Sequence, residues 1–513
     1  MGTIIRGKYV YTAFAEENAG LLYDAGVYIE GNRIVETGDL TRLREKYPDA
    51  ETVGNDHSAV LPGIIDAHSH GSGLSHVQRA VGFDFLENSL YDWAQCVVLP
   101  PELNAPLTAL RHLSNGAVMM HHNVMGVVGD RTAADISCRY LDAYRKTGMR
   151  VCFSPGIRDV NALISDDEAF YRTLPEDLKA FTHDQIFFDK ADARKAYFDW
   201  FGMLFEKYDS DMTKIFPGPC WAHGSTDELL LETKRAAEDR GHLPIHIHTL
   251  QTPIQRGYGM KKYGMSLLAR MDKLGIVDDN LTLGHAVYLD ENDIRILADR
   301  GASVTHHASC NLAMRNGISP VWYLEQAGVN VALGLDEKSI NDDEDVFMEL
   351  RMIYYLSRVS GFDLAGTPAL TPAQVFRMGT VNAAKSVGMA GRLGELKAGM
   401  LADITVMDLD EVENKPCIAP GADPSKTLIH RALGRFVTDV FVDGKRVIAG
   451  GKCTTIDTDA LYREVRDFTA KGIPEEKRRY AEKMQQLKPY MQAWCTPMQD
   501  WERKPFYAVN SRV

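Results

Sequence analysis

The stretch LPGIIDAHSH, residues 61–70, joins an apolar run to two histidines that lie two positions apart. Side chains at positions i and i+2 of a strand point to the same side, so His68 and His70 can face one ion at the carboxyl end of a strand. One H-x-H pair is weak evidence by itself, because such pairs also arise by chance. The meaning of this pair therefore depends on the rest of the chain.

Three further apolar runs end in metal-ligating side chains. Residues 243–247 lead to His248, LTLGH ends in His285, and VNVALGLD ends in Asp336. Each falls at the carboxyl end of a predicted strand, which is the face where barrel enzymes place their chemistry. Imidazoles together with a carboxylate form a mixed nitrogen and oxygen site that suits zinc, iron or manganese. Buried histidines that merely satisfy backbone carbonyls would explain one such position, but they explain four strand ends poorly.

Between the two ends of the chain, short apolar or β-branched runs alternate with longer stretches of helical periodicity. This pattern predicts repeated βα units in an α/β fold. Eight candidate strands fit a (β/α)8, TIM-like barrel; they end near residues 65, 120, 153, 216, 247, 283, 304 and 333. The stretch 159–214 is too long for a simple connection, so we expect a helical insertion over the barrel mouth.

Both ends of the chain have a β-rich character that differs from the middle. Residues 26–36 predict a hairpin with its turn at Gly31-Asn32, and residues 437–448 predict another with its turn at Asp443-Gly444. We expect the two ends to form one small β-sandwich domain. The predicted division is 1–60 and 396–458 for the sandwich, 61–395 for the barrel and 459–513 for a charged helical tail.

Composition excludes several classes of partner. The chain has 513 residues, 45% of them hydrophobic, with 57 basic and 70 acidic residues and a formal charge of −13. No Lys/Arg block tracks a phosphate backbone, so nucleic acid is not an expected partner. The eight scattered cysteines contain no C-x-x-C pair, and no run approaches the ~18 to 20 apolar residues that span a bilayer. We expect a soluble, cytoplasmic protein that does not bind membranes.

Taken together, these motifs make the chain similar to the amidohydrolase superfamily, and to its aminohydrolase and chlorohydrolase branch of cytosine, guanine and S-adenosylhomocysteine deaminases and triazine hydrolases. LPGIIDAHSH resembles the first-strand motif of that branch, LTLGHAV the sixth and GLDEKSINDD the eighth. HHASCNLAMRNGISPV is similar to its seventh-strand loop. The likeness runs from about residue 61 to 408 and is weakest between 159 and 214. It implies a small-molecule substrate and a homo-oligomer.

The resemblance also implies roles for individual residues. His68, His70, His248 and Asp336 would bind one divalent metal ion, most simply zinc, with iron or manganese as alternatives. His285 would orient water or substrate, and Asp336 would also take a proton from the bound water, whose pKa the metal lowers. His248 matches the family motif, whereas His246 would be a buried histidine behind it. His223 resembles the substrate-binding histidine of mononuclear deaminases.

The chain departs from the family pattern at Gln251. In the deaminases a glutamate three residues after the metal histidine shuttles a proton, and an amide cannot carry that proton at neutral pH, although it can hydrogen-bond. Glu337, directly after Asp336, is either a replacement for the missing acid or a salt-bridged carboxylate. His122 and His306 also lie at strand ends, where each is either a substrate contact or a packed histidine.

Three functions remain open from the sequence. The first is hydrolysis of a non-peptide C–N bond in a small, nitrogen-rich, heterocyclic substrate, by attack of metal-bound hydroxide. The second is cleavage of an amide, cyclic amide or urea, in which Asp336 or Glu337 handles the protons. The third is a catalytically inactive metal-binding homologue, which only Gln251 supports.

Overall fold

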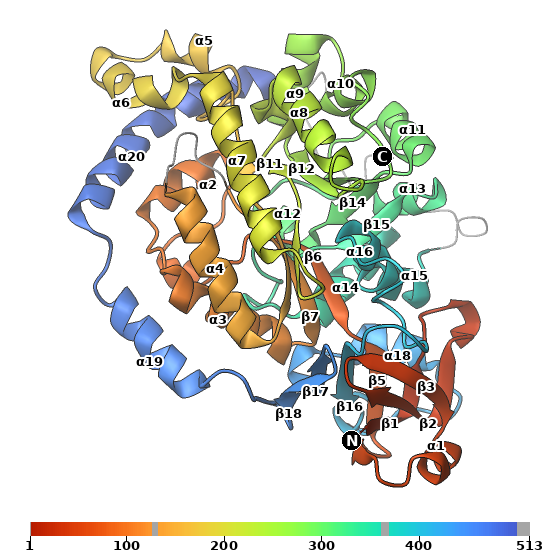
Figure 1. The fold of residues 1–513 in the computed structure, drawn as a ribbon. Helices are drawn as coiled ribbons and strands as arrows, with labels where there is room; N and C mark the ends of the chain where they lie inside the picture. The colour runs from red at the N-terminus through yellow and green to blue at the C-terminus, as the bar shows by residue number, and fades with distance from the viewer. Residues whose placement is uncertain (1, 126–131, 361–368, 500–513) are drawn as a thin grey trace.

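The computed structural model describes residues 2–125, 132–360 and 369–499, and Figure 1 shows their arrangement. The fold is mixed α/β, with parallel strands in the middle of the molecule, helices around them and a mostly antiparallel sheet beside the N-terminus. Part of the predicted tail, residues 500–513, lies outside the described residues.

All eight predicted barrel strands are present, in two parallel sheets of four strands each. The first sheet has the order β10(Thr213–Ile215), β8(Arg150–Ser154), β7(Ala117–Asn123), β6(Ile64–Ser69). The second has the order β12(Ile245–Thr249), β13(Leu281–His285), β14(Ser303–His306), β15(Asn330–Leu333). A short parallel pair, β9(Gly156–Ile157) and β11(Gly218–Pro219), follows the first sheet.

Backbone hydrogen bonds link the two sheets directly at one edge and, at the other, link β12 to the segment that follows β11. On one side the Asp336 N–H donates to the His68 carbonyl at 2.8 Å, and the His70 N–H donates to the Asp336 carbonyl at 3.0 Å. On the other side the His248 N–H donates to the Cys220 carbonyl at 3.1 Å. These links bring the carboxyl ends of β6, β12 and β15 to one place, because all the strands are parallel.

The helices between the parallel strands lie around the two sheets (Figure 1). Helix α8(Asp227–Glu238) follows Thr226, whose hydroxyl caps it by accepting from the Leu229 N–H. The predicted insertion holds α5(Asp167–Tyr171), α6(Glu176–Ile186) and α7(Lys190–Tyr208). The remaining helices up to β16 are α2(Leu86–Asp92), α3(Pro101–Ser114), α4(Ala133–Thr147), α8(Asp227–Glu238), α9(Pro253–Tyr263), α10(Leu267–Lys273), α11(Glu291–Arg300), α12(Ala308–Ala313), α13(Val321–Gln326), α14(Val346–Leu356), α15(Pro372–Met378) and α16(Val381–Ser386).

The two ends of the chain form one nine-stranded sheet, here called the terminal sheet. Its order is β19(Lys452–Cys453), β18(Lys445–Ala449), β17(Val437–Val442), β16(Ile404–Asp408), β5(Ser58–Pro62), β1(Thr3–Tyr11), β2(Leu21–Glu30), β3(Arg33–Asp39), with β4(Glu51–Val53) also paired to β1. Segments far apart in sequence meet where Val60 of β5 lies opposite Val406 of β16. Both predicted hairpins are present, β2–β3 and β17–β18. Three short helices flank this sheet, α1(Leu40–Lys46), α17(Asp410–Glu413) and α18(Pro424–Arg431).

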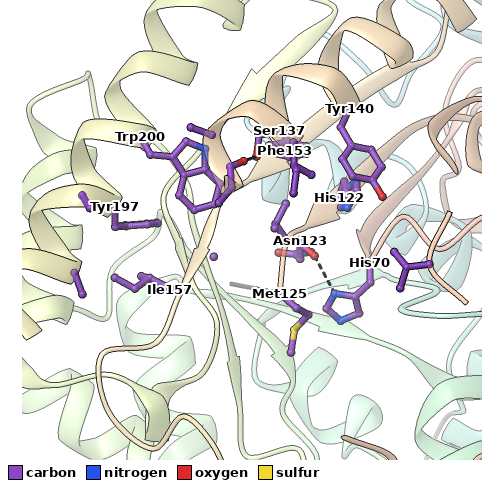
Figure 2. Close-up of a pocket in the computed structure, with 18 of the residues that line it drawn as sticks. His70, His122, Asn123, Met125, Ser137, Tyr140, Phe153, Ile157, Tyr197 and Trp200 are labelled. Carbon is purple, nitrogen blue, oxygen red and sulfur yellow. Dashed lines mark hydrogen bonds between the residues drawn. The ribbon is translucent and has the colours of Figure 1, made fainter. Parts of the chain in front are cut away.

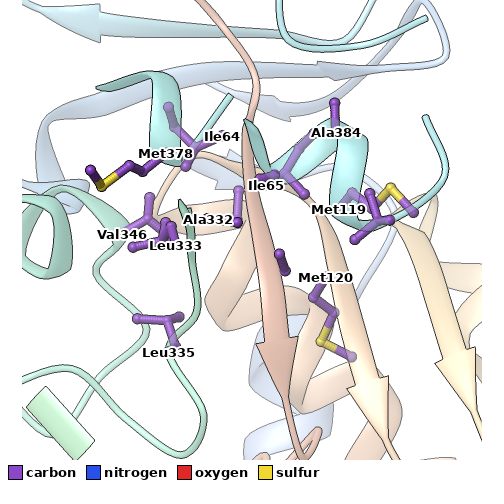
Figure 3. Packing of buried hydrophobic residues seen from close by; sticks show 14 of the residues in the cluster. Ile64, Ile65, Met119, Met120, Ala332, Leu333, Leu335, Val346, Met378 and Ala384 are labelled. Carbon is purple, nitrogen blue, oxygen red and sulfur yellow. The ribbon is translucent and has the colours of Figure 1, made fainter. Parts of the chain in front are cut away.

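Apolar side chains fill the space between the parallel strands and the helices, as Figure 3 shows around Ile64, Ile65, Met119 and Leu333. A buried ion pair ties this core to the terminal sheet. The fully buried Arg150 guanidinium donates to both carboxylate oxygens of Asp403, at 2.6 and 2.9 Å, and to Asp443 at 2.8 Å. The amino end of β8, where Arg150 lies, is therefore joined to the terminal sheet by this ion pair.

The described part of the tail is α19(Thr458–Thr469) and α20(Glu475–Cys495), which run along the outer edge of the molecule (Figure 1). Met484, Leu487 and Met491 of α20 pack with Tyr91 of α2 and Leu178 of α6. Helix α20 of the tail thus packs against both α2 and helix α6 of the predicted insertion. Within the described ranges, no helix is long and apolar enough to cross a membrane.

Candidate metal centre

Four side chains converge at the carboxyl ends of the parallel strands. One ligand atom from each of His68, His70, His248 and Asp336 lies within 4.8 Å of the others. Oδ1 of Asp336 lies 3.2 Å from Nε2 of His68 and 3.0 Å from Nε2 of His70. Nε2 of His248 lies 3.3 Å from Nε2 of His70. The structure therefore brings together the four residues that the sequence predicted as ligands.

The protonation of two of these imidazoles follows from their other contacts. Nδ1 of His70 donates to the Asn123 carbonyl at 2.9 Å (Figure 2), and Nδ1 of His248 donates to the Cys220 carbonyl at 2.7 Å. A carbonyl oxygen only accepts, so each neutral ring keeps a lone pair on Nε2. Two lone pairs then face each other beside a carboxylate. This arrangement fits a metal cation, which would bind both lone pairs and the carboxylate at once.

Burial and charge act in opposite directions on the acid–base groups of the site. Burial lowers the pKa of His68 and of His248 well below the ordinary value. For His70 the burial effect is outweighed by the hydrogen bond to Asp336, which raises its pKa to about 9. Burial favours the neutral form of Asp336, yet the surrounding histidines hold its pKa well below the usual range. The site thus keeps a carboxylate charged and draws positive charge toward it.

The second oxygen of Asp336 faces a different set of groups. Cys310 donates its thiol hydrogen to Oδ2 at 2.7 Å, and the nearest nitrogens of His285 and His307 lie 3.7 and 3.8 Å away. Nε2 of His285 is buried and has no hydrogen-bond partner among the described residues. Asp336 therefore turns one oxygen to the metal ligands and the other to groups that can exchange protons.

Backbone conformation at the site is unusual. His285 has φ 72° and Asp336 has φ 62°, in the left-handed region that non-glycine residues rarely occupy. Such strained positions persist only where the surrounding contacts hold them, and they cluster at functional sites. The Asp66 carboxylate supplies such a contact, since its Oδ1 accepts from the N–H groups of His68 at 3.1 Å and Leu335 at 2.9 Å.

Two cavities meet at the metal ligands. A small one of about 10 Å³ is lined by His248, His285 and Asp336 together with Gln251 and Glu337. A larger one of about 1060 Å³ adjoins it and contacts His70 and Glu337. Figure 2 shows its walls, which include Asn123, Met125, Tyr140 and Phe153, and, from α7 of the insertion, Tyr197 and Trp200. A small substrate can thus reach the ligands from a wide, partly aromatic vestibule.

The two residues at which the family pattern breaks share the small cavity. Gln251 is buried, follows β12 and lies just before α9. Glu337 is also buried, and its Oε2 lies 3.8 Å from Nε2 of His76 and 3.7 Å from the Arg79 guanidinium. Burial raises the pKa of Glu337, but His76 and Arg79 outweigh that effect, and the pKa is lowered overall. Glu337 is therefore a charged carboxylate beside the ligands.

The other predicted site residues lie at different depths. His122 lines the large cavity and hydrogen-bonds to the Tyr144 hydroxyl at 3.0 Å (Figure 2). His223 is not among the residues lining either cavity; its ring stacks on Trp221, which lines the small one. His306 is buried in β14 and is not among the lining residues either.

Sequence reasoning missed His307 and Cys310. Both come after the end of β14, where strand alternation no longer tells which way a side chain points. The available signal was the pair His306-His307, since two neighbouring histidines at a strand end must point in different directions. Nothing in the sequence indicated a role for Cys310, because it has no neighbouring cysteine and does not adjoin a predicted ligand.

Comparison with known proteins identifies relatives over most of the chain. The amidohydrolase family model matches residues 59–447, and a model of the bacterial imidazolonepropionase-like composite domain matches residues 25–50. A 5'-deoxyadenosine deaminase from Methanosarcina barkeri is 27% identical and aligns with 90% of this chain and 96% of its own. A 5-methylthioadenosine/S-adenosylhomocysteine deaminase from Thermococcus onnurineus is 30% identical and aligns with 87% of this chain and 93% of its own.

Solved structures of an adenosine deaminase and a triazine hydrolase variant share the fold of this chain. An adenosine deaminase from Xanthomonas campestris with bound zinc has a TM-score of 0.75 and 26% identity, and the alignment covers 91% of this chain and 98% of that one. A triazine hydrolase variant also has a TM-score of 0.75, at 21% identity, and covers 91% of this chain and 99% of its own.

Proposed function

Because this chain belongs to the amidohydrolase family, we propose that it hydrolyses a non-peptide C–N bond in a small, nitrogen-rich heterocycle. The enzyme is a metal-dependent hydrolase of the deaminase and chlorohydrolase kind. One observation carries the proposal. The Nε2 atoms of His70 and His248 converge beside the charged Asp336 carboxylate at the wall of a cavity.

We propose that His68, His70, His248 and Asp336 hold one divalent ion per chain. Zinc is the first choice, because a mixed set of imidazole and carboxylate ligands suits it and a relative contains it; iron and manganese are alternatives. When bound, the ion supplies the Lewis acidity that makes water a nucleophile at neutral pH. The protein supplies orientation and proton transfer.

Asp336 is the proposed general base. It accepts the proton of the attacking water at Oδ2, the oxygen near Cys310 and His285. His285 holds the water or the substrate in line with its buried Nε2, which has no other partner in the described ranges. General base catalysis of this kind contributes about 10²- to 10⁴-fold to the rate.

In this proposal Gln251 and Glu337 together replace the glutamate that deaminases have at position 251. The Gln251 amide hydrogen-bonds to a ring nitrogen of the substrate but carries no proton. Glu337, a charged carboxylate on the wall of the same cavity, first takes up the proton that Asp336 accepted from water and then passes it to the leaving nitrogen. His122 contacts the substrate in the large cavity, whereas His223 stacks on Trp221 of the small cavity and His306 lines neither cavity.

A second function, cleavage of an amide, cyclic amide or urea, is favoured by one specific observation. The amide of Gln251 lies where a deaminase needs a proton carrier, and amide cleavage can use Glu337 instead. A third possibility, an inactive homologue, is disfavoured because the convergence of the four ligands with His285 has no use in a protein that only keeps the fold.

The finer architecture is also proposed. The hydrogen bonds between the two parallel sheets support a closed (β/α)8 barrel over residues 61–395, with 159–214 as an insertion over its mouth. The branching of β1 to both β4 and β5 supports a β-sandwich from residues 1–60 and 396–458. Helices α19 and α20 support a helical tail in the described part of residues 459–513. We further propose a cytoplasmic homo-oligomer with small molecules as its substrates.

The test is product analysis with the metal-loaded, full-length enzyme. Candidate substrates are 5'-deoxyadenosine and 5-methylthioadenosine, with a cyclic amide and a substituted urea for the second function. Ammonia release with a hydroxylated ring is the expected result, whereas a new carboxylate or carbamate supports the second function. His285→Asn keeps the metal and is expected to lose turnover. Failure of the metal-loaded enzyme to turn over any nitrogen heterocycle, amide or urea would contradict the proposal.

A further inference from the structure

His246 makes a contact that the proposed mechanism does not use. It lies two positions before His248 on β12, is buried, and places its Nε2 within hydrogen-bond distance of Nδ1 of His68. The two rings are perpendicular, with centroids 4.6 Å apart and an interplanar angle of 85°. His246 therefore meets a proposed metal ligand edge to face, on the side of His68 that points away from Asp336.

The second nitrogen of His246 fixes the direction of this hydrogen bond. Nδ1 of His246 lies 3.2 Å from the Thr282 carbonyl oxygen on the neighbouring strand β13. Because that oxygen only accepts, Nδ1 of His246 carries the hydrogen, and Nε2 of the neutral ring is an acceptor. His68 must then be the donor to His246, through its Nδ1.

This direction determines which nitrogen of His68 can bind a metal. With its hydrogen on Nδ1, His68 keeps a lone pair on Nε2, the atom 3.2 Å from Asp336 Oδ1. We infer that His246 is a positioning residue. In this relay, the Thr282 carbonyl fixes the tautomer of His246, and His246 in turn holds His68 in the tautomer that binds the metal. In His70 and His248 the same tautomer is fixed by a direct hydrogen bond from Nδ1 to a main-chain carbonyl. In His68 it is fixed by the hydrogen bond to the imidazole of His246.

The backbone around the two rings is built to fit this contact. A Cβ atom at Gly284 would lie 3.1 Å from Cε1 of His68, 3.3 Å from its Nδ1 and 3.4 Å from Cε1 of His246. Glycine on β13 thus leaves room for both rings at once. This inference rests on the proposed metal site, since the tautomer of His68 matters only if Nε2 binds an ion.

The experiment measures the zinc dissociation constant of full-length protein, freed of metal and titrated with Zn²⁺ against a competing chelator. His246→Phe keeps a planar ring but removes the acceptor, and we expect zinc to bind about 10- to 100-fold more weakly. His246→Gln places an amide oxygen where Nε2 lay, and we expect affinity to return to within about 3-fold of wild type. Recovery of zinc affinity in His246→Gln would show that the hydrogen bond to His68, and not the packing of the His246 ring, accounts for the loss in His246→Phe.

His121→Phe is the matched control. His121 is also buried and its ring lies 4.9 Å from that of His246, but it hydrogen-bonds to Ser154 and Ala67 and contacts no ligand. Its zinc affinity should stay within about 3-fold of wild type. If His246→Phe does not fold, Gly284→Ala tests the same contact by adding a methyl group between the rings, and it should also weaken zinc binding.

Unchanged affinity in folded His246→Phe would overturn the relay, as would an equal loss in His121→Phe. Absence of zinc binding by the wild-type chain would overturn the metal site and the relay together. The two failures are therefore distinguishable.

Discussion

At the scale of single residues, the site is defined by where its protons lie. His70 and His248 each give their Nδ1 hydrogen to a main-chain carbonyl, which leaves Nε2 free to bind a cation. Asp336 separates two tasks, with Oδ1 toward the imidazoles and Oδ2 toward Cys310 and His285. Local hydrogen bonds thus prepare these two buried histidines for the proposed role of metal ligands.

Glu337 gives the first prediction at this scale. Replacing it in Glu337→Gln keeps the shape of the side chain but removes the proton carrier, so we expect kcat to fall about 100-fold with metal content unchanged. Adding Gln251→Glu to the same chain restores a carboxylate on the opposite wall of the small cavity and should recover part of kcat. Steady-state kinetics with metal analysis measures both effects. Full activity in Glu337→Gln would show that this carboxylate is structural.

Cys310 gives the second prediction. Its thiol donates to Oδ2 of Asp336 at 2.7 Å, and Cys310→Ser keeps a donor there, whereas Cys310→Ala removes it. A hydrogen bond to a charged group is worth about 1.5 to 3 kcal/mol, so kcat should fall at least about 10-fold in the alanine variant. The serine variant should stay within about 3-fold of wild type. Equal rates in the two variants would exclude this role for the thiol.

At the scale of elements, helix α14 supports α12, which carries Cys310. Glu349 of α14 accepts from the Ser309 N–H at 2.9 Å, and burial raises its pKa to about 8, from an ordinary value of 4.5. Between these two pH values the folded chain binds more protons than the unfolded chain. The contribution of Glu349 to stability is therefore greatest at acidic pH and is lost as the pH rises toward 8.

The third prediction concerns this pH dependence. In wild type, the contribution of Glu349 lowers the free energy of unfolding by up to about 1.4 kcal/mol per pH unit between pH 4.5 and 8. Glu349→Gln does not titrate, so its unfolding free energy should fall less steeply over that range. Urea unfolding at several pH values compares the two slopes. Identical slopes would mean that Glu349 is ionised in the folded protein at neutral pH.

The elements also show which parts of the structure local sequence can predict. The eight parallel strands were predictable because each is a short apolar run between polar turns. The four proposed ligands were predictable because each follows an apolar run and matches a motif of the family that the chain resembles; the period of two in a strand places only His68 and His70 on one side. His307 and Cys310 were not, since loop geometry after β14 directs them. The packing of α20 on α2 and α6 was also invisible, because it depends on contacts far apart in sequence.

At the scale of the whole molecule, the parallel strands and the terminal sheet are joined by Arg150. Its guanidinium is fully buried and bonds to Asp403 and Asp443 of the terminal sheet. Sequence could not predict this pair, because the partners are more than 250 positions apart. The sequence predicted that the two β-rich ends form one domain, but it did not predict that their strands join in one nine-stranded sheet.

The fourth prediction follows from that ion pair. Arg150→Ala leaves the buried Asp403 carboxylate without its charged partner, so we expect a loss of about 3 to 5 kcal/mol in the free energy of unfolding. The control is Arg139→Ala, which breaks an exposed pair with Glu102 and should cost less than about 1 kcal/mol. Chemical unfolding of both variants gives the comparison. A similar small cost for both would contradict a structural role for Arg150.

The central claim is that His68, His70, His248 and Asp336 hold one divalent ion. The most direct test is the metal content of purified full-length protein by mass spectrometry, for wild type, His248→Ala and His242→Ala. His242 lies in an exposed cluster with Glu238 and Asp278, and it controls for loosely bound metal. We predict about one zinc, iron or manganese ion per chain in wild type and His242→Ala, and none in His248→Ala. A wild-type chain without metal after reconstitution, or an equal content in His248→Ala, would contradict the account.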